Sequence, residues 1–191
     1  MKSRAYALLT ALAILPASLA AQATASAAPA PAPAPSTSPV ADGLRGMEQR
    51  FSRILVGAAE AMPADKYNYR PTPAQMSFAQ IQVHLANEGN DVLCGKAAGM
   101  EIPKRAAVDT TATKEQLVAR LKETFQFCEQ AFAKMDDSKL AEPVSMFGMN
   151  MNRAMAVLIT VADWSDHYNQ EANYLRLNNL LPPTAKPRTG M

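Results

Sequence analysis

The chain has 191 residues, and its 19 Lys and Arg residues nearly balance its 17 Asp and Glu residues, for a formal net charge of +2. The basic residues are scattered along the chain, whereas a nucleic-acid-binding protein gathers them into a patch. The composition therefore argues against a nucleic-acid partner.

The first 25 residues have the order of a secretory signal peptide. Lys2 and Arg4 precede an uncharged run from Ala5 to Ala20, and small residues suited to signal peptidase follow. The run contains Pro16 and is shorter than the ~20 residues of a membrane-spanning helix, which favours cleavage over a permanent anchor. We expect residues 1–25 to be removed and the mature protein to be periplasmic or secreted, without membrane association.

Residues 26–40 consist almost entirely of Ala, Pro and Ser. Alternating Ala-Pro pairs favour extended polyproline geometry and cannot form a packed core, so this stretch is predicted to be a linker. The remaining residues 41–184 have the usual size of one domain, and residues 185–191 are expected to form a flexible tail.

A first helix is predicted over residues 42–62. Its apolar residues fall three or four positions apart and form one stripe: Leu44, Met47, Phe51, Leu55, Ala58 and Met62. Pro63 ends the helix. The proline-rich stretch 65–73 that follows favours an extended connection rather than a helix.

A second helix is predicted from Ser77 to Ala98. Ser77 and Gln80 have the spacing of a capping box, in which each side chain bonds the other's backbone N–H. Gly99 can close the helix, because glycine tolerates the left-handed conformation common just after a helix. The predicted helix therefore has a signal at each end.

A third helix is predicted from Thr113 to Met135. Thr113 and Gln116 form a second capping-box pattern. The apolar residues continue at helical spacing: Leu117, Leu121, Phe125, Cys128, Phe132 and Met135.

The fourth helix is predicted to begin after a loop over residues 143–148 and to end near Asn179, before Pro182. Residues 154–162 are apolar on nearly every side, so we expect them to pack against several neighbours. No stretch alternates persuasively with a period of two, so strands are not needed. The expected fold class is all-α, with four helices of about 20 to 28 residues.

The two histidines lie on different predicted helices. His84 is in the second helix, and His167 is in the fourth, one turn after Asp163. Two histidines and a carboxylate on facing helices can hold a metal and leave coordination positions open. By spacing alone, ordinary histidines and a local Asp163–His167 ion pair remain an alternative. Glu88 and Asp91 are interpreted as part of the solvated side of the second helix.

Two separated groups of residues resemble the DinB-like family. The first comprises 59–63, 66–73, Ser77, Phe78 and His84. The second comprises 166–170, 174–179 and 181–183. The two motifs occur in the family's order and span essentially the whole mature domain, so the chain is similar to an exported member of this family.

The resemblance implies a four-helix bundle, often connected up-down-down-up, with a divalent metal held by one His of the second helix and two of the last. His84 and His167 match two of these ligands. The third position is usually His in the family and is Asp163 here. A 2-His-1-carboxylate set suits Zn, Ni, Mn or Fe, although the substitution also permits a site without metal.

Cys94 and Cys128 lie on the second and third predicted helices. In an exported protein an even number of thiols favours a disulfide between them. The alternative is a pair of reduced, buried cysteines that act as small hydrophobes.

Four methionines cluster before and within the start of the last helix: Met146, Met149, Met151 and Met155. Thioethers can form a soft copper(I) site. We favour core and loop filling, because methionine is a flexible gap filler.

Three functions fit the sequence. In the first, a metal bound by His84, Asp163 and His167 supports a hydrolase or transferase reaction on an unknown small molecule. In the second, the bundle is a non-catalytic metal-binding or small-molecule-binding protein, and in the third it is a stress-related scaffold that has lost its metal. Tyr168, Glu88 and Asp91 are candidates for a second catalytic group, but the spacing does not select one of them. Association into a homodimer through an exposed helix face is also considered.

Overall fold

The computed structural model describes residues 35–187, apart from the side chain of Glu88. The predicted signal peptide lies outside the described residues, as do most of the predicted linker and residues 188–191 of the predicted tail. In the described part, no helix is long and apolar enough to cross a membrane.

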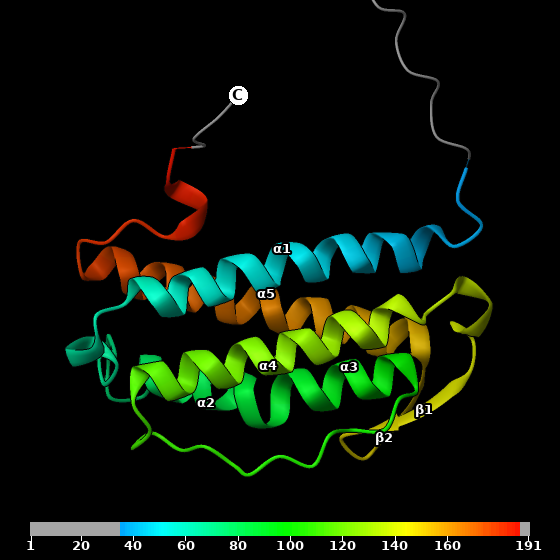
Figure 1. The fold of residues 1–191 in the computed structure, drawn as a ribbon, viewed down its shortest axis with the longest axis horizontal. Helices are drawn as coiled ribbons and strands as arrows, with labels where there is room; N and C mark the ends of the chain where they lie inside the picture. Colours follow the sequence, from blue (N-terminus) through cyan, green and yellow to red (C-terminus); the bar gives the residue numbers. More distant parts are fainter. Residues whose placement is uncertain (1–34, 188–191) are drawn as a thin grey trace, which may run out of the picture. The chain divides into compact units, whose positions relative to one another are not determined.

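The described residues are mostly helical (Figure 1). The helices are α1 (Pro39–Ala61), α2 (Phe78–His84), the π-helical turn η2 (Leu85–Gly89), α3 (Asn90–Ala98), α4 (Lys114–Ala133) and α5 (Arg153–Leu177). Short 3₁₀ helices lie at Ala64–Lys66 (η1), Asp137–Lys139 (η3) and Pro183–Ala185 (η4). Helix α1 packs against α4 and α5, and α3 packs against the same two helices.

Both predicted capping boxes are present. The Ser77 hydroxyl accepts from the Gln80 backbone N–H at 3.2 Å, and the Gln80 side chain accepts from the Ser77 N–H at 2.7 Å. Thr113 and Gln116 make the same reciprocal pair at the start of α4. Each box satisfies two backbone donors that the first helical turn leaves without a partner.

The second predicted helix occupies the expected residues but is not a continuous α-helix. The π turn η2 begins directly after His84 and separates α2 from α3. A π turn accommodates one extra residue per turn, which does not interrupt the apolar pattern enough to be visible in the sequence. Gly99 follows α3 with φ of 68°, which confirms its predicted role at the helix end.

The expectation that strands are not needed is wrong for residues 143–152. Strands β1 (Pro143–Met146) and β2 (Met149–Asn152) form an antiparallel hairpin in which Pro143 pairs with Asn152. Phe147 and Gly148 connect them with φ values of 52° and 73°, as in a two-residue type I′ turn. Strands of four residues are too short for a persuasive alternation, and Phe is not a typical residue for this turn.

The core is organised around Trp164 of α5, which is fully buried. Its ring lies 5.9 Å from that of Phe51 on α1, and 5.7 Å and 6.0 Å from those of Phe125 and Phe132 on α4. Its indole N–H donates to Asn90 Oδ1 at 2.8 Å, which adds a contact with α3. Trp164 of α5 therefore contacts α1, α3 and α4.

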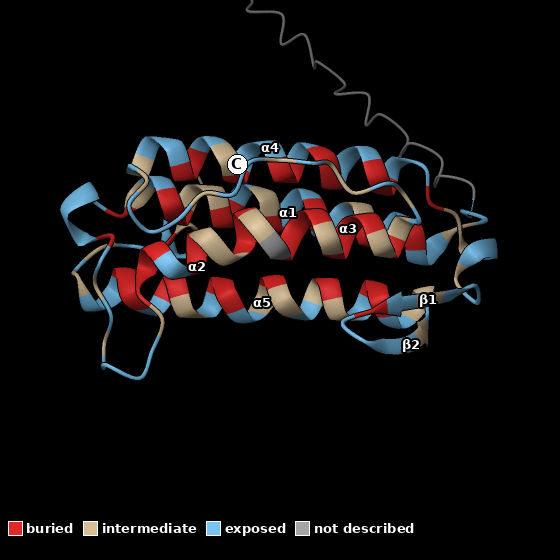
Figure 2. Ribbon diagram, turned by 90° about the horizontal axis from the view of Figure 1, so that it is seen from below, coloured by how far each residue is buried: buried red, intermediate tan, exposed pale blue. Residues whose placement is uncertain are grey.

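The first half of α5 is not surrounded by neighbours, contrary to the prediction. Leu158 is 63% exposed and Met155 is 47% exposed, whereas Ala156, Val157 and Thr160 are buried. Figure 2 shows buried and exposed residues recurring along the long helices, α5 included. The apolar run therefore includes an outward face that no other described element covers.

A disulfide joins Cys94 of α3 to Cys128 of α4, with their Cα atoms 5.1 Å apart. The pairing resolves the two alternatives left by the sequence in favour of the bridge. It fixes α3 to α4 across a sequence separation of 34 residues. Closing a loop of this size restricts the unfolded chain, with a stabilisation of about 2–4 kcal/mol.

Candidate metal centre

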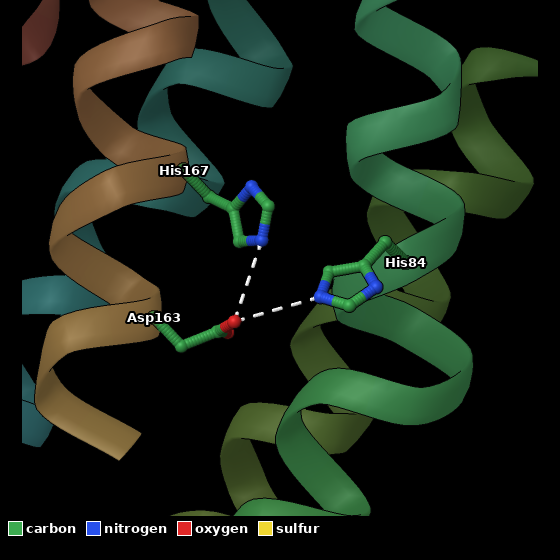
Figure 3. A group of neighbouring side chains, drawn as sticks. All are labelled: His84, Asp163 and His167. Carbon is green, nitrogen blue, oxygen red and sulfur yellow. Dashed lines mark ion pairs between the residues drawn. The ribbon is translucent and has the colours of Figure 1, made fainter. Parts of the chain in front are cut away.

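Three side chains from two helices meet at the candidate site. His84 is the last residue of α2, whereas Asp163 and His167 lie one turn apart on α5. In Figure 3 the two α5 side chains and the His84 imidazole point into the same space between the helices. The structure therefore brings together the three residues that the sequence singled out.

Both imidazoles approach the same carboxylate oxygen. Asp163 Oδ1 lies 3.5 Å from His84 Nε2 and 3.4 Å from His167 Nε2, as drawn in Figure 3. The two imidazole centroids are 4.6 Å apart with their planes inclined by 54°. One ligand atom from each of the three residues lies within 4.8 Å of the others.

The two Asp163 distances are those of long ion pairs, and they also match the spacing of ligands around a metal ion. Nitrogen–oxygen hydrogen bonds are usually about 2.7–3.2 Å long. Two ligands about 2.0–2.2 Å from a shared tetrahedral ion are instead about 3.3–3.6 Å apart. The two Asp163 distances fall in the second range, and all three ligand atoms lie within 4.8 Å of one another, so the residues present fit a small divalent ion once the two imidazoles move slightly closer together.

The electrostatics of the site favour a charged carboxylate. Burial by itself raises the pKa of Asp163, but favourable interactions with His167 and His84 outweigh it and bring the pKa to about 2. Asp163 is thus ionised at neutral pH and supplies a negative ligand. The side chain of His167 is 9% exposed, that of Asp163 22% and that of His84 34%. Solvent therefore reaches the site on the His84 side.

Two buried polar atoms of the site have no hydrogen-bond partner among the described residues: Asp163 Oδ2 and His167 Nδ1. Leaving a buried polar atom unpaired costs about 1–3 kcal/mol. A histidine that ligates a metal usually donates its second ring N–H to a carboxylate or carbonyl. His167 therefore lacks, among the described residues, the outer partner that a metal-bound histidine usually has.

The comparisons with known proteins agree with this arrangement of helices. A sequence model of the DinB superfamily matches residues 49–173. The chain belongs to the DinB superfamily. A comparison with curated proteins found no significant match.

Solved structures of DinB-like proteins share this fold. A DinB-like protein from Bacillus cereus is 12% identical, with a TM-score of 0.62, over 74% of this chain and 95% of its own. A DinB-like protein from Bacillus subtilis is 13% identical, with a TM-score of 0.61, over 77% of this chain and 99% of its own. At these identities the likeness establishes the DinB-like fold alone.

Other candidate residues of this DinB-superfamily chain are engaged elsewhere. Asp91 is buried and accepts from Arg105 Nε at 2.7 Å, so its assignment to the solvated side of the helix is wrong. The segment after α3 covers it, which helical spacing does not reveal. The Tyr168 hydroxyl donates to Thr184 Oγ1 at 2.8 Å. The side chain of Glu88 lies outside the described part.

The π turn η2 shapes the site, and no pattern in the sequence predicts it. A Cβ atom placed on Gly89 would lie 3.7 Å from Asp163 Oδ2 and 3.3 Å from the His84 carbonyl oxygen. Asn87 fixes the turn from outside, since its side chain donates to the Val108 carbonyl at 2.6 Å and accepts from the Val108 N–H at 3.0 Å. Because Gly89 has no side chain, its backbone can lie close to the carboxylate of Asp163.

A buried carboxyl one turn beyond His167 was also missed. Glu171 is fully buried, and burial raises its pKa well above the usual range despite the hydrogen bond from Gln82 Nε2. The spacing of Asp163, His167 and Glu171, each four residues apart, places all three on one stripe of α5.

Proposed function

We propose that this chain binds a divalent metal ion, of which Zn, Ni, Mn and Fe are the candidates, through His84, Asp163 and His167. We further propose that the site supports hydrolysis or group transfer on a small molecule. The observation that carries the proposal is the pair of distances from Asp163 Oδ1 to the two Nε2 atoms, 3.4 Å and 3.5 Å. The three side chains are supplied by rigid helices, which suits a preformed site.

The three residues have different parts in this proposal. A divalent ion, when bound, lowers the pKa of a coordinated water or thiol and so supplies a nucleophile. Asp163 contributes the negative charge of the donor set, because its carboxyl is ionised at neutral pH. His167 is the most buried of the three and anchors the inner side, whereas the more exposed His84 borders the side that solvent and substrate can reach.

A non-catalytic metal-binding or small-molecule-binding role is the second candidate. It is favoured by the engagement of Tyr168 with Thr184 and of Asp91 with Arg105. Tyr168 and Asp91 are therefore not positioned to transfer a proton at the three-residue site. The third candidate, a scaffold without metal, rests on Asp163 standing where the family usually has His.

Metal titration of the purified protein tests the proposal. We expect near-stoichiometric binding by calorimetry for at least one of the four metals, lost in His84→Ala and in His167→Ala. Asp166→Asn is the matched control, because Asp166 is exposed on the same helix and bonds Gln170. Wild-type protein that binds none of the four metals would remove the metal proposal, and binding without hydrolytic turnover would favour the second candidate.

We also propose that the helices form a four-helix bundle of up-down-down-up connection, with α2, η2 and α3 acting as one bent helix. The sequence colours of Figure 1 support this topology, since α1 and α5 run in one direction and α2–α3 and α4 in the other. A crystal structure of residues 35–187 would test it.

Export to the periplasm or beyond the cell rests on the predicted signal peptide, 1–25. Expression of the full chain in a bacterial host, followed by N-terminal sequencing of the periplasmic and secreted fractions, tests this. A new N-terminus near residue 26 is expected. Retention of Met1 would contradict it.

Size-exclusion chromatography of the same protein tests the proposed homodimer. A gel-shift assay tests the expected lack of nucleic-acid binding.

A further inference from the structure

A basic pocket lies between α1 and the C-terminal segment that follows α5. Its volume is about 510 Å³, and its walls include Arg50, Arg53, Thr184 and Lys186, with Ile54 and Pro183 as apolar parts. A pocket of this size falls in the range that small molecules occupy. None of the three proposed metal ligands lines it.

Specific contacts build this pocket from distant parts of the chain. The Tyr168 hydroxyl donates to Thr184 Oγ1 at 2.8 Å and accepts from the Thr184 backbone N–H at 3.1 Å. Pro183 lies over Gly57 of α1, where an added Cβ would come within 3.2 Å of Pro183 Cγ. These contacts hold the C-terminal segment on α1 and carry Lys186 to the two arginines.

The charged residues that line this pocket are all positive, and Glu60 lines the neighbouring pocket that shares Arg53 and Lys186 with it. Arg50 and Arg53 are three residues apart on α1 and so share a face. Among residues 35–187, neither arginine nor Lys186 makes an ion pair, and no carboxylate lines the pocket. The chain as a whole is almost neutral, so this local excess of positive charge is not a general property of its surface.

We propose that the basic pocket binds the phosphate group of a small molecule or of a lipid headgroup. Three like charges around one pocket repel each other, and a bound dianion offsets that repulsion. Guanidinium groups bind phosphate oxygens in pairs of parallel hydrogen bonds, and the Lys186 ammonium adds a further charge. The apolar parts at Ile54 and Pro183 can contact the organic portion of the ligand.

Calorimetric titration with phenyl phosphate and with inorganic phosphate tests the proposal. EDTA is included so that no ion at His84, Asp163 and His167 takes part. We expect phenyl phosphate to bind wild-type protein, and to bind the double variant Arg50→Gln/Arg53→Gln at least about tenfold more weakly. The charge-matched control is Arg70→Gln/Arg176→Gln, which removes two exposed arginines outside the pocket and should leave binding unchanged.

Co-sedimentation with vesicles of equal parts phosphatidylcholine and phosphatidic acid identifies the source of the phosphate. Binding to these vesicles alone, lost only in the pocket variant, supports a lipid headgroup, whereas binding of phenyl phosphate supports a soluble ligand. Equal weakening in the control variant, or no binding of any probe, would overturn the proposal. Thermal unfolding of each variant verifies that a loss of binding does not result from a loss of folding.

Discussion

Two clusters of polar side chains meet at neighbouring residues of α5, Asp163 and Trp164, and differ in how their hydrogen bonds are satisfied. Around Trp164, the indole N–H donates to Asn90 at 2.8 Å, Asn90 donates to Thr124 at 3.0 Å, and Thr124 donates to a backbone carbonyl at 2.9 Å. Around the neighbouring Asp163, the closest approaches of the two histidines are 3.4 Å and 3.5 Å.

The comparison separates a cluster that stabilises the fold from one suited to a ligand. Every polar side-chain atom near Trp164 has a partner at ordinary hydrogen-bond length. Near Asp163, two buried atoms have no partner among the described residues. Buried polar groups are normally satisfied, so the two unpaired atoms agree with the proposed ligand site, although Gln82 Oε1, Asp91 Oδ1 and Glu171 Oε2 outside it are unpaired as well.

The largest effect is expected when the stabilising cluster is broken. Trp164→Ala removes a fully buried ring that contacts α1, α3 and α4, and should lower the free energy of unfolding by about 3–5 kcal/mol. Leu158→Ala on the exposed face of the same helix is the control and should change it by less than about 0.5 kcal/mol. Urea unfolding measures both. Similar losses in the two variants would show that Trp164 does not organise the core.

The second prediction concerns the cluster suited to a ligand. Asp163→Asn removes the negative ligand and should weaken metal binding about a hundredfold, which corresponds to about 2.7 kcal/mol. Asp163→His installs the residue usual in the family and should retain binding. Competition with a chromophoric chelator measures both affinities. Undiminished binding by Asp163→Asn would exclude the carboxylate as a ligand.

Glu48 on α1 extends the comparison to a third buried polar group. Burial, with a smaller contribution from the negative charge of Glu129, raises the pKa of Glu48 from 4.5 to about 7. The folded state therefore binds the proton more tightly than the unfolded state does. The stability that this group contributes is fully present below about pH 4.5 and is lost as the pH rises to about 7.

Glu48→Gln should abolish that dependence and make the protein up to about 3 kcal/mol more stable than wild type at pH 8. Urea unfolding at pH 5 and pH 8 measures the difference. Glu101→Gln, at an exposed position, is the control and should follow wild type. Parallel pH profiles for wild type and Glu48→Gln would show that Glu48 titrates normally.

The smallest effect is expected at the π turn. Gly89→Ala places a methyl group 3.3 Å from the His84 carbonyl oxygen, a distance that requires a small shift of the turn. We expect metal affinity to fall a few-fold, with a change in unfolding free energy below about 1 kcal/mol. Gly46→Ala is the control, because an added Cβ there meets nothing within 4 Å. A change in stability without a change in affinity would give Gly89 a purely structural role.

Much of the fold was predictable because its determinants are local. The capping boxes at Ser77 and Thr113 and the glycine after α3 act within a few residues, and the structure confirms all three. The position of Asp163 one turn before His167 likewise follows from helical geometry. The hairpin was missed because each strand has only four residues, too few for a periodic pattern.

The sequence by itself determined which residues form the long helices, since helix formation depends on spacing along one segment. It also placed Asp163 one turn before His167, whereas the grouping of these two residues with His84 was implied by the resemblance to the DinB-like family. Only the tertiary structure decided how far apart those side chains lie, that Cys94 bonds Cys128, that Asp91 is buried and that Leu158 is exposed. These properties depend on how helices distant in the chain pack against each other. Local periodicity contains no information about that distance.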